Sequence, residues 1–271
     1  MTIKLVLAGC GNMGYAMLSG WLKAGKLVPS AVFVVEPNAE LRQRAAALGC
    51  GSAVDAGGIP ADAVPDLVVV AVKPQVIRDV TASYKRFSDG RTTFVSIAAG
   101  TPVATFEEIL GGRAPVMRCM PNTPAAIGKG MMVLFSNSLV SDDTKRFVAD
   151  LLSASGEVTT IADEGLMDAV TAVSGSGPAY IFHFIEALTV AAEKAGLPIE
   201  TAKLLAMQTV YGAASLAAES REEPGVLRQQ VTSPNGTTAA ALGVLMGEDR
   251  LTNLLTQAVE AARLRSIELG K

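Results

Sequence analysis

The feature that most constrains this chain is a glycine pattern near its first residue. An aliphatic run from Ile3 to Ala8 leads directly into Gly9, Gly11 and Gly14, and an apolar helical stretch follows. In a strand–turn–helix, such glycines permit a tight turn, a close backbone approach to a pyrophosphate, and close packing of helix on strand. Backbone N–H groups at the helix start then face the phosphates. The pattern predicts a dinucleotide site that includes Gly9, Gly11, Asn12, Met13 and Gly14.

An acid at the end of the second predicted strand supports this interpretation. Glu36 lies 22 residues beyond the last glycine of the pattern, where an acid normally accepts hydrogen bonds from the ribose hydroxyls. It would face the 2′-phosphate of NADPH with like charge, which favours NADH. Arg42 and Arg44 on the following helix and Asn38 in the turn could instead reach a phosphate. The choice between NADPH and NADH therefore stays open.

The first half of the chain alternates short aliphatic runs with helical stretches. Several runs are apolar on successive residues, as expected of strands that are buried on both faces. The predicted strands are Ile3 to Ala8, Val32 to Glu36, Leu67 to Val72, Thr93 to Ala98, Val116 to Met120 and Met131 to Phe135. The predicted helices are Asn12 to Ala24, Ala39 to Leu48, Gln75 to Arg86, Pro102 to Leu110 and Asp142 to Leu152. This order predicts an α/β, Rossmann-type domain, a parallel sheet with helices on both faces.

The second half reads as entirely helical. After about Asp163 the strand pattern stops, and Gly and Pro punctuate helical periodicity. The last stretch carries an apolar stripe at Leu251, Leu254, Leu255, Ala258, Val259 and Ala262. We therefore expect a dinucleotide-binding domain over residues 1–162 and an all-α domain over 163–271.

Composition excludes several classes of protein. Lys and Arg number 23 against 26 Asp and Glu, with no block of like charge, which argues against nucleic-acid binding. The aliphatic runs are far shorter than the roughly 18 to 20 residues of a membrane span, and the run before Cys10 is too short for a lipoprotein signal. One His and three Cys offer no metal-ligand spacing and no even disulfide framework, so no metal is expected. A reducing, cytoplasmic setting follows.

Three further segments end predicted strands and should meet at the cofactor crevice, because open α/β sheets bind ligands at their carboxyl ends. The first holds Ala71, Val72, Lys73 and Pro74, with Lys73 alternatively an ordinary solvated lysine. The second holds Ala98. In the third, Asn122 between two prolines is a candidate donor to the nicotinamide amide or a simple turn residue.

Two segments of the helical half differ from a packed core. Ser174 to Pro178 interrupts an apolar helical pattern, and Ser233 to Thr238 opens a helix with several side-chain hydrogen-bonding groups. A helix start with free N–H groups, a positive dipole end and hydroxyls suits a carboxylate. The same pattern suits a simple N-cap, and the two interpretations carry equal weight.

These segments together resemble pyrroline-5-carboxylate reductase, and the resemblance spans almost the whole chain. The most specific stretches are Ala172 to Tyr180 and Val231 to Thr238. The resemblance implies reduction of 1-pyrroline-5-carboxylate to L-proline by hydride transfer from NADPH or NADH, the last step of proline biosynthesis. It also implies a C-terminal domain that dimerises, a homodimer that can assemble further into a decamer, and substrate bound between the cofactor domain and helices at the dimer interface.

The resemblance also implies roles for individual residues. The substrate carboxylate would be held by Ser233, Asn235, Gly236 and Thr237, and the Thr238 hydroxyl would meet the ring nitrogen. Thr238 and Ser174 are the expected catalytic residues. Asn235 departs from the family's second glycine and needs the left-handed conformation that Asn tolerates. Glu36 departs from a small polar residue, which leaves the cofactor preference in doubt.

Two other functions would account for part of these motifs. A 3-hydroxyacid dehydrogenase would share the glycine pattern but should carry a catalytic Lys-x-x-x-Asn helix, and neither Lys194 nor Lys203 has Asn four residues later. A non-enzymatic dinucleotide sensor would not need the hydroxyl-rich helix start. Oxidation of NAD(P)H with and without pyrroline-5-carboxylate separates the three.

Overall fold

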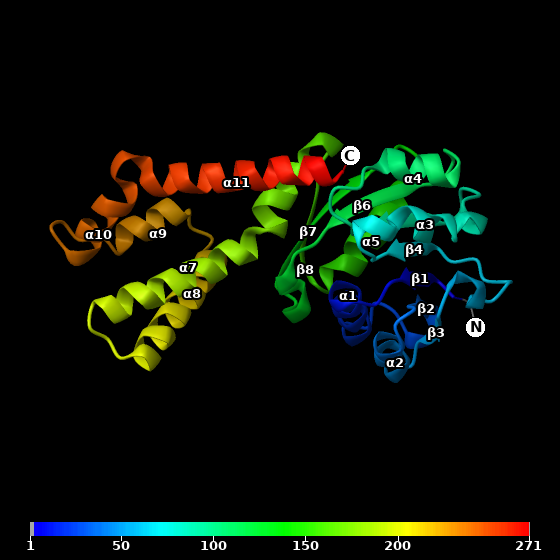
Figure 1. The fold of residues 1–271 in the computed structure, drawn as a ribbon, viewed down its shortest axis with the longest axis horizontal. Coiled ribbons are helices and arrows are strands. Elements are labelled where there is room, and N and C mark those ends of the chain that lie inside the picture. Colours follow the sequence, from blue (N-terminus) through cyan, green and yellow to red (C-terminus); the bar gives the residue numbers. More distant parts are fainter. Residues whose placement is uncertain (1–2, 271) are drawn as a thin grey trace. The chain divides into compact units, whose positions relative to one another are not determined.

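The structure is a computed structural model that describes residues 3–270. Its sheet has eight strands in the order β3-β2-β1-β4-β5-β6-β7-β8 (Figure 1). Their bounds are β1 Leu5–Ala8, β2 Val32–Val35, β3 Gly51–Ala53, β4 Leu67–Val70, β5 Thr93–Ser96, β6 Val116–Met120, β7 Gly130–Ser136 and β8 Gly156–Thr160. The expected Rossmann-type architecture is confirmed.

The strand order reverses at β1. Leu5 lies opposite Val32 of β2 on one side and opposite Leu67 of β4 on the other, and both pairings are parallel. The chain runs outward from β1 to β3, returns to β4 and continues outward to β8. The carboxyl ends of β1 and β4 therefore flank the point where open α/β sheets bind their ligands.

The last two strands depart from the predicted parallel arrangement, because β8 is parallel to β7 and both run opposite to the other six. β7 runs antiparallel to β6, with Cys119 opposite Leu134. A parallel crossover needs a dozen or more residues, whereas β6 and β7 are joined by a segment that contains only the short 3-10 helix Thr123–Ile127. The short connection therefore reverses the chain direction.

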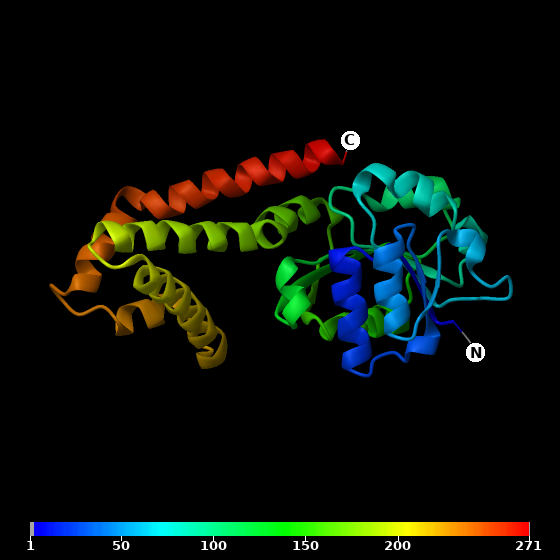
Figure 2. The same cartoon turned by 60° about the horizontal axis from the view of Figure 1, so that its bottom comes forward.

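Two layers of core cover the two faces of the sheet. Leu5 and Leu7 pack on one face, and Val6 and Ala8 pack on the other. The first face is covered by α1 (Asn12–Lys23), α2 (Ala39–Ala47) and α5 (Asp142–Ser153), and the second by α3 (Ile77–Ala82) and α4 (Val103–Leu110). Figure 2 shows α1 and α2, in blue, side by side. Burial on both faces explains why the strands are apolar on successive residues.

The described chain divides into two compact units. Residues 3–176 with 262–270 form the sheet unit, and residues 177–261 form the helical unit. After β8 come α6 Met167–Val170, the π-helix Thr171–Gly175, α7 Gly177–Lys194, α8 Ile199–Ser220, α9 Pro224–Gln230, α10 Thr237–Met246 and α11 Arg250–Leu269. A functional division after residue 162 stays a prediction.

The helical unit has almost no core of its own. Among its described residues, Ala202 and Ala206 are the only buried apolar side chains, and α7 packs against α8. Many large apolar side chains are exposed, among them Phe182, Leu204, Met207, Tyr211, Leu216, Val244 and Leu254. An apolar surface of this extent is typical of a protein interface.

Six strands lie where the sequence predicted them, and two were not predicted. β3 and β8 are the two edge strands of the sheet. The helix expected over Gln75 to Arg86 is shorter, because α3 is flanked by the 3-10 helices Pro74–Val76 and Lys85–Phe87. Within residues 3–270, no helix combines the length and apolar character needed to cross a bilayer.

Candidate cofactor and substrate sites

The glycine loop joins β1 to α1 and is shaped by close backbone contacts. Gly9 has φ +94°, and a Cβ there would lie 2.6 Å from the carbonyl oxygen of Ala71. A Cβ on Gly14 would lie 2.5 Å from the carbonyl oxygen of Gly9. At Gly11, by contrast, no atom of the described residues lies within 4 Å of an added Cβ. Gly11 therefore leaves open the approach that a pyrophosphate needs, at the start of α1.

A cavity of about 580 Å³ opens at the carboxyl ends of β1, β2 and β4. Gly9, Gly11 and Glu36 form one part of its wall, and Ala71, Val72 and Lys73 form another. Val54, Asp55, Ala56, Val76, Asp79, Val80, Ser83 and Tyr84 also line it. The structure thus brings together the predicted cofactor residues from three strand ends, in a cavity that suits the adenosine half of a dinucleotide.

Glu36 is tied to the glycine loop. The residue is only 6% exposed, and the backbone N–H of Cys10 donates to its Oε2 at 2.7 Å. The N–H of Asn38 donates to Oε1 at 2.9 Å. Burial and the Glu36 carboxylate raise the pKa of the Cys10 thiol to about 11. Each carboxylate oxygen keeps a second lone pair, so Glu36 can still accept from a ribose hydroxyl.

The groups that could have attracted a 2′-phosphate are engaged elsewhere. Arg42 donates from Nη1 to the carbonyl oxygens of Glu36 and Pro37, at 2.7 and 3.0 Å. The guanidinium of Arg44 lies 3.8 Å above the Tyr15 ring. The Asn38 side chain accepts from Leu41 N–H and caps α2. In the part of the chain that the structure describes, none of the three lines the 580 Å³ cavity.

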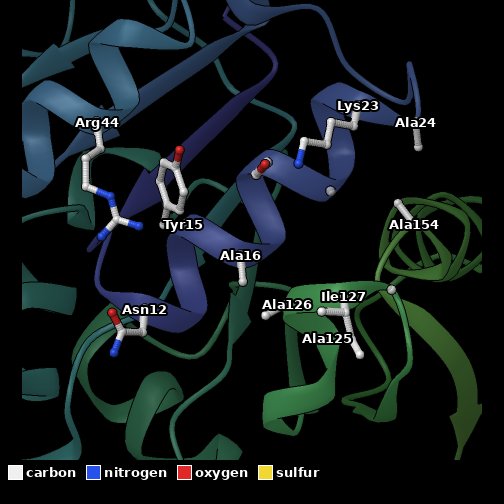
Figure 3. A pocket seen from close by; sticks show the side chains of 13 residues that line it. Asn12, Tyr15, Ala16, Lys23, Ala24, Arg44, Ala125, Ala126, Ile127 and Ala154 are labelled. Atoms are coloured by element: carbon white, nitrogen blue, oxygen red, sulfur yellow. The ribbon is translucent and has the colours of Figure 1, made fainter.

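A second cavity, of about 770 Å³, lies along α1 and the 3-10 helix Thr123–Ile127 (Figure 3). Asn12 lines this cavity at the start of α1, with Tyr15 and Arg44 close by. Much of the remaining lining is Ala and Gly, contributed by Ala16, Gly20, Ala24, Ala125, Ala126, Gly128 and Ala154. Its exposed cations are Lys23 and Arg44.

At the far strand ends, β5 and β6 contribute Ala98 and Asn122. Ala98 is buried and packs with the second core layer. The Asn122 amide donates from Nδ2 to the carbonyl oxygen and the hydroxyl of Ser174, at 3.2 and 3.3 Å, and its Oδ1 accepts from Met131 N–H. Two residues predicted from separate motifs, Asn122 and Ser174, are therefore in direct contact.

In the helical unit, the hydroxyl-rich segment forms the start of α10. Asn235 has φ +57°, the left-handed conformation that its position required. Gly236 is the N-cap residue, and its N–H donates to the Ser233 carbonyl oxygen at 3.0 Å. Within the described residues, no side chain caps this helix. The N–H groups of its first turn, Thr237 and Thr238, are thus left for a ligand or water.

Two family models match different parts of the chain. Residues 164–269 match the family model described as "Pyrroline-5-carboxylate reductase dimerisation", and residues 4–100 match "NADP oxidoreductase coenzyme F420-dependent". The pyrroline-5-carboxylate reductase of Pseudomonas aeruginosa is 42% identical over 100% of this chain and 98% of its own. The chain belongs to the pyrroline-5-carboxylate reductase family.

Solved structures of this family have the same fold. A pyrroline-5-carboxylate reductase from Coxiella burnetii is 36% identical, with a TM-score of 0.92 over 100% of both chains. A Plasmodium falciparum pyrroline carboxylate reductase with NADP bound is 30% identical, with a TM-score of 0.85 over 99% of this chain and 98% of that one.

The expected identity is confirmed by these comparisons. The chain is an NAD(P)H-dependent oxidoreductase that reduces pyrroline-5-carboxylate to proline, in proline biosynthesis. Its dimerisation region indicates that it forms homo-oligomers.

Sequence reasoning missed one part of the cavity wall. Val54, Asp55 and Ala56 reach the cavity from the end of β3, a strand that was not predicted. The available signal was weak: Asp55 accepts from Gly57 N–H and caps a single 3-10 turn. An Asp followed by Ala-Gly-Gly is typical of such a turn, but it carries no sign of a ligand.

Proposed function

We propose that this reductase binds the substrate carboxylate at the start of α10 and the dinucleotide at the carboxyl ends of β1 to β6. The observation that supports it most directly is the uncapped first turn of α10, with Thr237 and Thr238 in it. An N-terminal helix turn attracts an anion through its N–H groups and its positive dipole end.

The cofactor fits the residues present. The open position at Gly11 admits a pyrophosphate to the first N–H groups of α1, including those of Asn12 and Met13. The 580 Å³ cavity holds adenosine between Glu36 and the segment that ends in Lys73 and Pro74. The bound nicotinamide supplies the hydride, near Ala98 and Asn122 at the far strand ends.

The substrate is held by charge and by hydroxyl groups. The N–H groups of Thr237 and Thr238 and the Ser233 hydroxyl bind the carboxylate, while Asn235 and Gly236 shape the turn. The Gly236 N–H already donates to the Ser233 carbonyl oxygen, so its contribution is to stabilise this turn. The Thr238 hydroxyl accepts from the ring nitrogen, and Ser174 is the second catalytic residue of the proposal. With substrate and cofactor positioned, orientation supplies most of the rate.

The charges around the adenosine cavity favour NADH. Glu36, Asp55 and Asp79 line it against one cation, Lys73. A 2′-phosphate at the ribose would meet like charge from Glu36.

The oligomer we propose is a homodimer formed through the exposed apolar side chains of α7, α8 and α11, which can assemble further into a decamer. Burying that surface on a second copy would give the helical unit the core that it lacks alone. The three cysteines are unpaired and buried, as suits a cytoplasmic protein.

The test is oxidation of NADH and NADPH with pyrroline-5-carboxylate, with a 3-hydroxyacid, and with no second substrate. Oxidation only with the imine supports the proposal. Thr238→Val should lower kcat/KM for the imine by roughly tenfold or more, because one hydrogen bond to a charged group is worth about 1.5 to 3 kcal/mol. Cofactor affinity should not change.

A matched control is Thr256→Val on α11, whose hydroxyl donates to the carbonyl oxygen of Thr252 at 2.8 Å. It loses the same hydroxyl and should keep kcat/KM. An equal loss in both variants, or none at Thr238, would leave α10 with a structural cap only.

A further inference from the structure

Ser174 lies in a π-helical part of the backbone. Residues Thr171–Gly175 form a π-helix, closed by the N–H of Ser176 donating to the carbonyl oxygen of Thr171 at 2.8 Å. Short π segments are rare overall, and those that occur are often at functional sites. The α-helical partner of the Ser174 carbonyl would be the N–H of Pro178, which proline does not have. The carbonyl of Ser174 therefore lacks its usual α-helical donor and can accept from a donor elsewhere in the fold.

Asn122 supplies that donor from the end of β6. Its Nδ2 lies 3.2 Å from the Ser174 carbonyl oxygen and 3.3 Å from the Ser174 hydroxyl oxygen. Its Oδ1 accepts from the N–H of Met131 at 2.9 Å. One amide group thus links β6, the start of β7 and the π-helix, with both its donor and its acceptor atoms engaged.

The π-helix lies directly against the end of β6. A Cβ on Gly175 would overlap the terminal methyl group of Met120, so the π-helix is in close contact with the last side chain of β6. Met120 is the last residue of β6, and Asn122 comes two residues later, at the edge of the sheet where open α/β sheets bind their ligands. Ser174 is therefore held at that edge by its hydrogen bonds to Asn122 and by the contact of its neighbour Gly175 with Met120.

We propose that Asn122 is a positioning residue that acts through Ser174 in imine reduction. A serine hydroxyl has one hydrogen and two lone pairs. When Nδ2 of Asn122 occupies one lone pair, the hydroxyl hydrogen is directed away from Asn122 and is available to donate to a reacting group at this edge of the sheet. The role rests on the proposed function of Ser174 and deepens it.

The test variant is Asn122→Asp, which keeps the side-chain shape and the acceptor for Met131 N–H. As a carboxylate it cannot donate to Ser174, so kcat for the imine should fall about tenfold or more at pH 8. The KM for NAD(P)H should change less than twofold, because Nδ2 of Asn122 donates to Ser174 rather than to the nicotinamide amide, the alternative that its position in the sequence also allowed. A larger rise in this KM would favour that alternative and overturn the proposal.

The pH profile separates positioning from a general loss of structure. Below the pKa of the new carboxyl group its O–H can donate to the Ser174 carbonyl oxygen, as Nδ2 does. The ratio of variant to wild-type kcat should therefore rise as the pH falls toward 5. A pH-independent ratio would overturn the proposal, since a packing defect does not regain a donor.

Asn137 offers a matched control at the opposite end of β6. Its Nδ2 donates to Glu107 Oε1 at 3.0 Å and to the carbonyl oxygen of Ala114 at 3.2 Å, and its Oδ1 accepts from Val116 N–H at 3.2 Å. Asn137→Asp should lower the Tm at least as much as Asn122→Asp and leave kcat unchanged. Loss of kcat in both variants would contradict the proposal.

A double variant checks that Asn122 acts through Ser174. Ser174→Ala should lower kcat, and adding Asn122→Asp should lower it by less than the product of the two single effects. Full additivity, or an unchanged kcat in Ser174→Ala, would overturn the inference. The proposed function is judged separately, by wild-type turnover of the imine and by Thr238→Val, neither of which involves Asn122.

Discussion

The two units of this chain are stabilised in different ways. The sheet unit has a buried layer on each face of its sheet, with Trp21 on one and Phe94 and Phe106 on the other, all fully buried. The helical unit buries only Ala202 and Ala206 among its described apolar residues, although its helices are rich in Leu, Val and Met. The same hydrophobic composition therefore makes a core in one unit and a surface in the other.

This difference shows where stability must come from. The sheet unit removes its apolar area from water within a single chain, at about 25 cal/mol per Å² of buried surface. The helical unit leaves comparable side chains exposed, so its stability depends on a second copy, as the match to a dimerisation model indicates. Changes in the two units should accordingly be detected by different measurements.

The largest effect is expected from a charge in the apolar surface of α8. Leu204 is 68% exposed in the single chain. In a two-fold interface Leu204→Arg removes two leucines at about 1.5 to 3 kcal/mol each, which weakens association roughly a hundredfold or more. Light scattering across a dilution series should show monomer at concentrations where the wild type is associated.

The matched control is Val28→Arg in the sheet unit, where Val28 is 60% exposed. It should leave the association unchanged. If both variants associate like the wild type, α8 is not covered by a second copy, and the contrast between the units fails.

A core substitution tests the other side of the comparison. Phe94→Ala leaves a cavity in the sheet unit and should lower the free energy of unfolding by about 3 to 5 kcal/mol. Trp21 is the chain's one tryptophan and lies in the same unit, so its fluorescence reports this transition in urea. The midpoint should not depend on protein concentration.

Phe182→Ala is the corresponding change in the helical unit, where Phe182 is exposed. It should leave the Trp21 transition close to that of the wild type and weaken association instead. A large shift of the Trp21 midpoint would mean that the two units do not unfold separately.

The sequence predicted the interior of the sheet better than its edges. The strand Val116–Met120 was predicted to the residue, because four of its five residues are apolar, as is typical of an inner strand buried on both faces. β3 and β8 were missed because Gly51–Ala53 has no large apolar residue and Gly156–Thr160 has only Val158. An edge strand is held by backbone bonds to one neighbour, which leaves little trace in its side chains.

The candidate site divides in a similar way. A local pattern sufficed for the glycine loop, which depends on neighbouring residues, whereas the left-handed conformation of Asn235 was indicated by the resemblance to the family. The contact of Asn122 with Ser174 joins residues 52 positions apart, and spacing carries no sign of it. Asp55 was missed together with β3. Roles within the site remain predictions.

Ionisation of the cysteines at alkaline pH should affect the sheet unit alone, because all three cysteines lie in it. Burial raises the pKa of the Cys119 thiol from 9.0 to about 12, so this thiol stays protonated when folded. The unfolded thiol ionises above pH 9. The stabilisation is therefore complete below pH 9, and the free energy of unfolding falls by about 1.4 kcal/mol per pH unit per thiol above it.

The measurement is urea unfolding followed through Trp21 at pH 8, 9 and 10. Cys119→Ala should make the free energy of unfolding fall less steeply between pH 9 and 10, by up to about 1.4 kcal/mol per pH unit. This difference separates the thiol from the lysines and tyrosines that titrate in the same range. An unchanged slope in this variant would show that Cys119 does not contribute.

The smallest effect is expected at Glu36, and it should leave association in place. Glu36→Gln removes the charge and keeps one acceptor oxygen, so one of the two backbone N–H groups that Glu36 now binds keeps its partner, which a shorter side chain could not reach. Relief of roughly 1 to 2 kcal/mol of screened repulsion should raise kcat/KM with NADPH, relative to NADH, about five- to thirtyfold.

Asp55→Asn gives the graded comparison, because Asp55 lines the same cavity but is exposed. Solvent screens its charge more strongly, so the same ratio should rise less than fivefold. Steady-state kinetics with both cofactors decides the matter. An equal response at both positions would mean that net charge of the cavity, rather than the buried Glu36 carboxylate at the ribose, sets the preference. No response at either would mean that the 2′-phosphate lies beyond both acids, and that the exposed Lys73 is left as the one charged group of the cavity able to bind it.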